Sequence, residues 1–187
     1  MSAKIILIAI IGFISQRAFG QLDYSDDFLY LLEHAQIDFY EPVEGKYKAM
    51  NMRKDVFQPC DYGIRSRKEK LEIRYLIAPY SENSPAFSAP HVETTRMVAH
   101  LASNDPDAVI TVLSMDEQEL RGDFNADWGK VFFFKPKEQF STSQHCKLLS
   151  LYAEGKGMAL VFFLFDKPSQ ELDNRFLALR FKDDMAN

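Results

Sequence analysis

The sequence predicts one α/β domain of the α+β type, a single layered sandwich in which a mixed or mostly antiparallel sheet of about five to seven strands carries packed helices. Three observations support this prediction. The chain has 187 residues, of which 47% are hydrophobic and 26% charged, a composition typical of a folded globular domain. Several short segments are apolar on both faces, as strands covered on both sides are. Segments with helical spacing of apolar residues lie between them.

Residues 1–20 have the pattern of a cleaved secretory signal peptide. Lys4 gives a positive start, residues 5–14 are apolar, and the small residues Ala18 and Gly20 indicate cleavage before residue 21. Ten apolar residues would rise about 15 Å as a helix, half of a ~30 Å hydrocarbon core, so a permanent span is not expected. The alternative is a buried N-terminal helix. We expect residues 21–187 to form one exported domain, periplasmic or secreted, with no transmembrane segment after the signal.

The first half of this domain is predicted to contain one helix and three strands. Ser25 is suited to cap a helix whose apolar residues recur at helical spacing, namely Phe28, Leu31, Leu32 and Ala35. The three strands are expected at residues 45–50, 57–64 and 71–78.

The strand at 71–78 is the clearest of the three. Its odd-numbered residues are apolar, whereas Glu72 and Arg74 lie on the other face, which we expect to be solvated. The basic run at residues 65–70 precedes it. We interpret this run as a hairpin turn with solvated charges, and an isolated run of this kind in an acidic chain is a weak binding signal.

The second half contains a surface loop and then further helix and strand patterns. Residues 81–90 hold three serines, two prolines and one asparagine, so they predict a loop. Helices are expected at residues 91–103 and 141–154, with a short one that follows a Ser114–Glu117 capping box and ends at Gly122. Strands are expected at residues 108–113, 130–135 and 158–165, all apolar on both faces and therefore expected to be covered on both sides. Residues 169–182 fit a helix or a strand.

Two cysteines, Cys60 and Cys146, allow one intramolecular pairing. Export would permit a disulfide between them, and a bond that closes so long a loop could stabilise the fold by about 4 kcal/mol. The alternative is two separate buried thiols that act as small hydrophobic residues. The spacing in the sequence leaves both possibilities open.

Residues 123–129 form the most distinctive polar segment. Asp123, Asn125 and Asp127 occupy alternate positions, as oxygen ligands do at the start of a calcium loop. The match then fails, because Trp128 stands where the turn needs glycine and Phe134 stands where a bidentate glutamate is needed. We therefore expect no metal here. Asp123, Asn125, Asp127 and Trp128 remain candidate ligand-binding residues of a loop that leads into a strand.

No catalytic residue and no cofactor site is predicted. The four histidines stand in no metal-ligand spacing, and no nucleophile elbow, phosphate-binding loop or dinucleotide fingerprint is present. His145 precedes Cys146, but helical neighbours point about 100° apart, so this histidine could not serve simply as the base of a cysteine nucleophile.

The leading functional hypothesis is an exported, soluble, non-enzymatic domain that binds a protein partner or a small ligand through loops 81–90 and 123–129. One alternative is an exported hydrolase whose Cys–His or carboxylate site is assembled only in three dimensions. Another is a structural subunit of an envelope complex. The charged residues comprise 22 basic and 27 acidic side chains, which argues against nucleic acid as the main partner.

Overall fold

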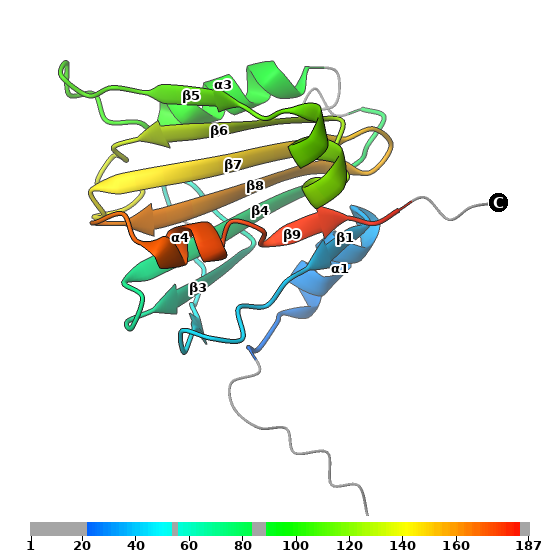
Figure 1. Ribbon diagram of the computed structural model, residues 1–187, viewed down its shortest axis with the longest axis horizontal. Helices are drawn as coiled ribbons and strands as arrows, with labels where there is room; N and C mark the ends of the chain where they lie inside the picture. Colours follow the sequence, from blue (N-terminus) through cyan, green and yellow to red (C-terminus); the bar gives the residue numbers. More distant parts are fainter. Residues whose placement is uncertain (1–21, 54–55, 84–88, 184–187) are drawn as a thin grey trace, which may run out of the picture.

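The computed structural model describes residues 22–53, 56–83 and 89–183 (Figure 1). The predicted signal peptide with its cleavage site, and residues 84–88 of the predicted binding loop, lie outside the described residues. Within the described part of the chain, no helix is long and apolar enough to cross a membrane.

The main element is an antiparallel sheet of seven strands in the order β2-β3-β4-β8-β7-β6-β5 (Figure 1). A separate two-stranded antiparallel sheet pairs β1 with β9. The fold is therefore α+β, as the sequence predicted, with a mostly antiparallel sheet. The strands are β1 (Ile37–Phe39), β2 (Lys48–Ala49), β3 (Tyr62–Ser66), β4 (Leu71–Pro79), β5 (Thr111–Ser114), β6 (Trp128–Phe134), β7 (His145–Ala153), β8 (Gly157–Phe165) and β9 (Leu179–Phe181).

Helix α1 (Asp26–His34) begins where local capping chemistry favours it. The N-cap Ser25 accepts a hydrogen bond from the backbone N–H of Phe28, which confirms the helix start predicted from the sequence. The helical elements of the described residues are α1 (Asp26–His34), α3 (Pro90–Leu101), the π-helix η1 (Glu119–Phe124) and α4 (Gln170–Asn174).

Strand β8 lies at the centre of the large sheet, and all nine of its residues are buried. It pairs with β4 on one side and with β7 on the other, each over nine residues in register. The continuous apolar run Gly157–Phe165 is explained by this position, because a central strand with cover on both faces has no solvated side chains.

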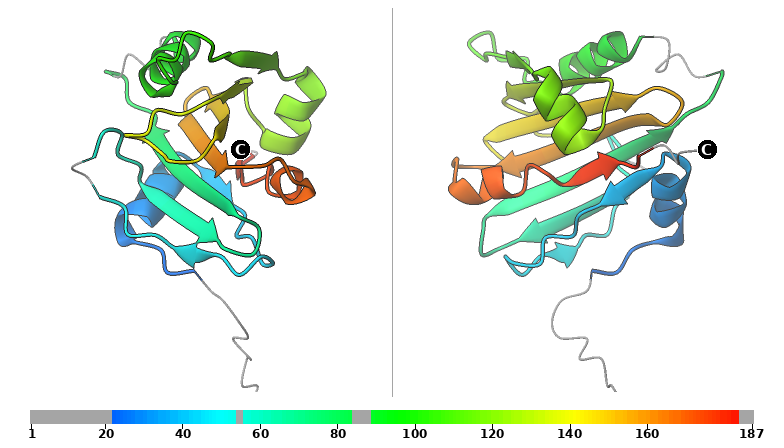
Figure 2. Two further views of the ribbon diagram at one scale, coloured as in Figure 1. Left: turned by 90° about the vertical axis from the view of Figure 1, so that its left-hand side faces the viewer. Right: turned by 45° about the vertical axis from the view of Figure 1, so that its right-hand side comes forward.

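Alternation along the strands divides the core into two clusters. One face carries Val131, Leu149 and Phe163 and packs against α1, β1, β9 and residues of η1 and α4; we call it the β9 face. The opposite face carries Phe132, Leu148 and Phe162 and packs against Val98 and Leu101 of α3; we call it the α3 face. Figure 2 shows the elements on either side of the sheet.

The helix predicted at residues 141–154 is wrong, because this segment forms strand β7. Cys146, Leu149 and Ala153 do fit helical spacing, but the residues between them are also mostly buried. A segment that is apolar on every side carries no periodicity that separates a helix from a strand. Here pairing with β6 and β8 decides the conformation.

The predicted cover on both sides of residues 108–113 is also wrong. The strand β5 that forms there is Thr111–Ser114, at one end of the sheet order, and all four of its residues are exposed. Conversely, the face of β4 that was expected to be solvated is covered. Glu72 is buried there, and Arg74 donates a 2.8 Å hydrogen bond to the carbonyl oxygen of Phe140.

Smaller differences concern element ends. The first two predicted strands shift to β2 and β3, and the short helix is the π-helix η1, whose capping pair is Asp116 and Glu119 instead of Ser114 and Glu117. Each of these two side chains accepts a hydrogen bond from the backbone N–H of the other residue. Residues 169–182 contain both a helix, α4, and a strand, β9.

Candidate functional site: an exposed apolar sheet edge

The polar segment 123–129 connects η1 to β6 and contacts residues 181 and 182. Asn125 adopts the left-handed conformation, with φ 48°, at the end of η1. Its side-chain amide donates hydrogen bonds to the carbonyl oxygens of Phe181, at 3.2 Å, and Lys182, at 2.9 Å. Asn125 therefore ties η1 to the residues of β9 and just beyond it.

Of the other predicted binding residues, Asp127 makes similar contacts within the fold. Asp127 forms a 2.7 Å ion pair with Arg121 and accepts a 2.7 Å hydrogen bond from the backbone N–H of Glu154. Trp128 is half-buried at the start of β6, opposite Tyr152 of β7, and Asp123 is exposed. Asn125 and Asp127 therefore make hydrogen bonds that connect parts of the fold, whereas Asp123 and Trp128 do not share this role in the contacts described.

The histidine and cysteine side chains do not gather into a catalytic arrangement. Both cysteines are free, buried thiols in the cluster on the α3 face. Burial raises the pKa of Cys60 to about 12 and that of Cys146 well above its usual value, so neither is an activated nucleophile. His145 is exposed and its ring lies 5.5 Å from the ring of Phe165, whereas His100 stacks on Phe57 at 4.2 Å. The described residues contain no cluster of histidine, cysteine and carboxylate groups that could hold a metal ion.

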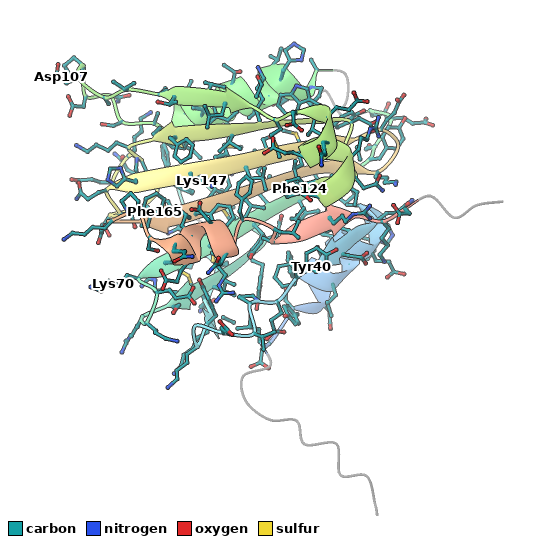
Figure 3. All side chains as sticks on the ribbon, viewed as in Figure 1. Tyr40, Lys70, Asp107, Phe124, Lys147 and Phe165 are labelled. Carbon is teal, nitrogen blue, oxygen red and sulfur yellow. The ribbon has the colours of Figure 1, made fainter. Side chains whose placement is uncertain are left out.

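One buried lysine stands out on the β9 face, where Lys147 and Phe124 are labelled in Figure 3. The Lys147 ammonium lies 3.9 Å from the ring centre of Phe176 and 3.7 Å from an oxygen of Asp173. Loss of solvent lowers the pKa of Lys147, and the Asp173 carboxylate opposes this effect. Because Asp173 belongs to α4, these contacts hold α4 against the sheet.

A cavity of about 740 Å³ lies between α1 and residues 49–52 and 59–62. Its size is suited to a small ligand. However, two of the three carboxylates that line it, Asp27 and Asp61, already have partners, Asp61 by accepting a 2.7 Å hydrogen bond from the backbone N–H of Ile77, and the third, Asp23, is an exposed group. The cavity therefore offers no specific chemistry from which a ligand could be identified.

The edge strand β5 is the most unusual surface. Four bulky apolar side chains in and before it are exposed: Val109 by 74%, Ile110 by 44%, Val112 by 46% and Leu113 by 51%. Edge strands in soluble proteins are usually protected by charged residues, prolines or bulges, because their unpaired backbone groups can pair with another chain. Residues 108–115 contain none of these charges or prolines.

The two sides of this edge differ in their neighbours. Val112 lies opposite Phe132 and so belongs to the α3 face, whereas Leu113 lies opposite Val131 and belongs to the β9 face. A strand added outside β5 could therefore contact one apolar side chain on each face while its backbone pairs with that of β5.

Acidic residues flank the apolar edge at both ends. Asp105 and Asp107 precede it, and Asp116, Glu117 and Glu119 follow it, all exposed. Asp105 lies 3.6 Å from the ammonium of Lys135, which partly offsets its charge. A partner segment would therefore pass between two patches of negative charge.

This edge was not predicted from the sequence, although its signal is visible there. The apolar run was assigned to the interior, and Glu117, one of the acidic residues that follow it, was assigned to a helix cap. An uncharged segment of residues that favour strands, with acidic residues on either side, is also typical of an exposed edge strand. Only the position of β5 in the sheet order separates the two interpretations.

Comparison with known proteins found no match at the level of a family model, a curated protein or a solved structure. Any functional assignment therefore depends on the residues of this chain.

Proposed function

We propose that this protein is an exported, non-enzymatic binding domain that captures an extended segment of a partner protein at the β5 edge. The scaffold in this proposal is the layered sandwich expected from the sequence. The observation that carries the proposal is the exposure of Val109, Ile110, Val112 and Leu113 along an edge strand. Contiguous exposed apolar surface is characteristic of interaction sites, and addition of a strand to a sheet edge is a common mode of peptide recognition.

Apolar burial alone would give only weak binding. Complete burial of a valine, leucine or isoleucine side chain contributes about 1.5–3 kcal/mol, so four half-exposed side chains contribute about 3–6 kcal/mol. Association itself costs about 4–15 kcal/mol in lost motion. Backbone hydrogen bonds to β5 and favourable charges on the partner must therefore supply the remainder.

Charge complementarity favours a heterologous partner over a second copy. Antiparallel pairing of β5 with itself would place Asp105 and Asp107 of one copy beside Asp116 and Glu117 of the other. Like charges opposed in this way are unfavourable. The proposed partner segment is therefore extended, apolar at its centre and basic at its flanks.

The alternative of a hydrolase receives less support from the same structure, because both cysteine thiols are buried and burial raises their pKa values. The subunit hypothesis shares the need for an exposed apolar surface and is a special case in which the partner is permanent.

A displayed library of random nine-residue peptides tests the proposal. Selection on the protein should enrich peptides with alternating apolar residues between lysine or arginine flanks. Val112→Lys should weaken binding of an enriched peptide by about tenfold or more, since it places a charge at the centre of the edge. Val43→Lys is the matched control, because Val43 is 91% exposed and lies outside every strand.

Three results would count against this assignment. The first is that the enriched peptides bind the Val112→Lys variant as tightly as they bind the wild type. The second is that no peptide is enriched. A dimer dissociated by Val112→Lys, detected by light scattering, would instead assign the edge to a second copy.

A further inference from the structure

The sheet edge opposite β5 carries a concentration of positive charge. A cavity of about 440 Å³ there is lined by five cationic side chains, Lys46, Lys48, Arg65, Arg67 and Lys68, together with Ala49 and Met50. None of these lining residues is a carboxylate. The two edges can be located in Figure 3 by Asp107, near β5, and Lys70, in the turn that joins β3 to β4.

The pairing of β2 with β3 and the alternation of buried and exposed residues beside it bring the cations together. The chain contains Lys-Tyr-Lys at residues 46–48 and Arg-Ser-Arg at residues 65–67. The central residues, Tyr47 and Ser66, are both buried. The flanking residues are exposed, and antiparallel pairing of β2 with β3 places Lys48 directly opposite Arg65.

The buried residues hold this arrangement in place. The hydroxyl of Tyr47 donates a 2.6 Å hydrogen bond to Glu69, and the hydroxyl of Ser66 donates one to the carbonyl oxygen of Gly45. Glu69 also accepts a 2.7 Å hydrogen bond from Arg175. The backbone under the cations is therefore fixed by contacts on the opposite side of the strands.

The charges in the cavity are only partly neutralised by the protein. Arg65 is paired with Glu72, which also binds Arg74. Lys46, Lys48 and Arg67 form no ion pair among the described residues. Lys68 helps to lower the pKa of Glu69, but the hydrogen bonds of that carboxylate are made to Tyr47 and Arg175. Like charges opposed across a strand pair destabilise a sheet, so a bound anion would relieve this repulsion.

We propose that the cavity between β2, β3 and the β3–β4 turn is a binding site for a small polyanion, a ligand that carries two or more phosphate or sulfate groups. Arginine and lysine side chains are suited to both groups, arginine through paired N–H donors and lysine as a point charge. The cavity volume is within the range of small-ligand sites.

Two further observations define the ligand class. The whole chain has a formal charge of −5, so the positive cavity is opposite in sign to the protein as a whole. No aromatic side chain is among the described residues that line the cavity, whereas single-stranded nucleic acid sites use aromatic rings to stack bases. A compact polyanion without bases therefore fits the site better than a nucleic acid does. The site lies across the sheet from β5 and is independent of the function proposed there.

Calorimetric titration with two probes, inositol hexakisphosphate and sucrose octasulfate, tests this proposal at low ionic strength. The double variant Lys48→Glu, Arg67→Glu should weaken binding by about a hundredfold, roughly tenfold for each charge-assisted hydrogen bond that the variant removes. The control variant Lys130→Glu, Lys167→Glu makes the same change in net charge outside the cavity and should bind as the wild type does. A Lys48→Gln, Arg67→Gln variant, in which no new charge is introduced, should lie between the two.

Each outcome has a defined meaning. Tighter binding of one probe assigns phosphate or sulfate as the preferred group, and similar binding of both supports the polyanion class. Dissociation constants above about 1 mM for both probes would overturn the proposal. Equal weakening in the control variant would also overturn it, because binding would then follow net charge and not the cavity.

Discussion

Replacing Phe28 with alanine should destabilise the protein severely, because Phe28 connects α1 to the large sheet. Its side chain is fully buried, stacked on Tyr62 with ring centres 4.5 Å apart and edge-on to Phe39 at 5.6 Å. Truncation of a buried phenylalanine costs about 3–5 kcal/mol. Each aromatic pair adds about 0.5–1.5 kcal/mol beyond its burial. The measured range for truncation already includes contacts of this kind, so these ring pairs place Phe28→Ala at its upper end, with an expected loss of about 4–5 kcal/mol in the free energy of unfolding.

Urea unfolding followed by circular dichroism measures this loss as a lower midpoint with an unchanged slope. Phe28→Leu retains most of the buried volume but loses the pairs that Phe28 forms with neighbouring aromatic rings, and should cost about 1–2 kcal/mol. Leu29→Ala is the matched control on the same helix, since Leu29 is 48% exposed, and should cost less than about 1 kcal/mol. A loss below about 2 kcal/mol for Phe28→Ala would refute the docking of α1 on the sheet.

Two further predictions concern buried polar groups. Lys147→Met should leave stability at neutral pH unchanged or raise it by about 1–2 kcal/mol, because it removes a desolvated charge. The pKa of Lys147 is lower in the folded than in the unfolded chain, so wild-type stability should rise as the pH rises toward the unfolded pKa of about 10.4. The difference in stability between the variant and the wild type should shrink over the same range. Urea titrations between neutral and alkaline pH measure this, and wild-type stability that falls relative to the variant would contradict it. Cys60 and Cys146 should react with a thiol reagent only after unfolding, and two thiols should then be counted. A count of zero under non-reducing conditions would show a disulfide instead.

The elements that could be predicted from the sequence are those whose local pattern admits one interpretation. The strand at residues 71–78 alternates in polarity, and the run at residues 158–165 is short and wholly apolar, so both were placed within a residue of β4 and β8. The hairpin turn between β3 and β4 was also predicted, although its first two predicted residues, Arg65 and Ser66, belong to β3. Ser25 and the residues after it define the start of α1 through local hydrogen bonding, which needs no tertiary information.

The errors share a physical cause, which is that burial on both sides depends on neighbours far along the chain. Residues of β7 fit two periodicities, and only their pairing with β6 and β8 selects the strand. Residues of β5 resemble a buried strand in composition, but β5 is the last strand in the sheet order. The basic cavity was missed because its cations come from β2 and β3 regions separated in sequence, so that Lys48 meets Arg65 only in the folded sheet.

The pairing of β1 with β9 has a consequence for the order in which the contacts of this domain form. Leu179 and Phe181 are completely buried, and their partners in β1, Phe39 and Ile37, lie far away in the sequence. Bringing together two segments so distant along the chain costs loop-closure entropy, so we expect this small sheet to form after the local hairpins of the large sheet. Until it forms, Ile37 and its apolar neighbours stay uncovered, and partly folded chains in that state are the species most prone to aggregation.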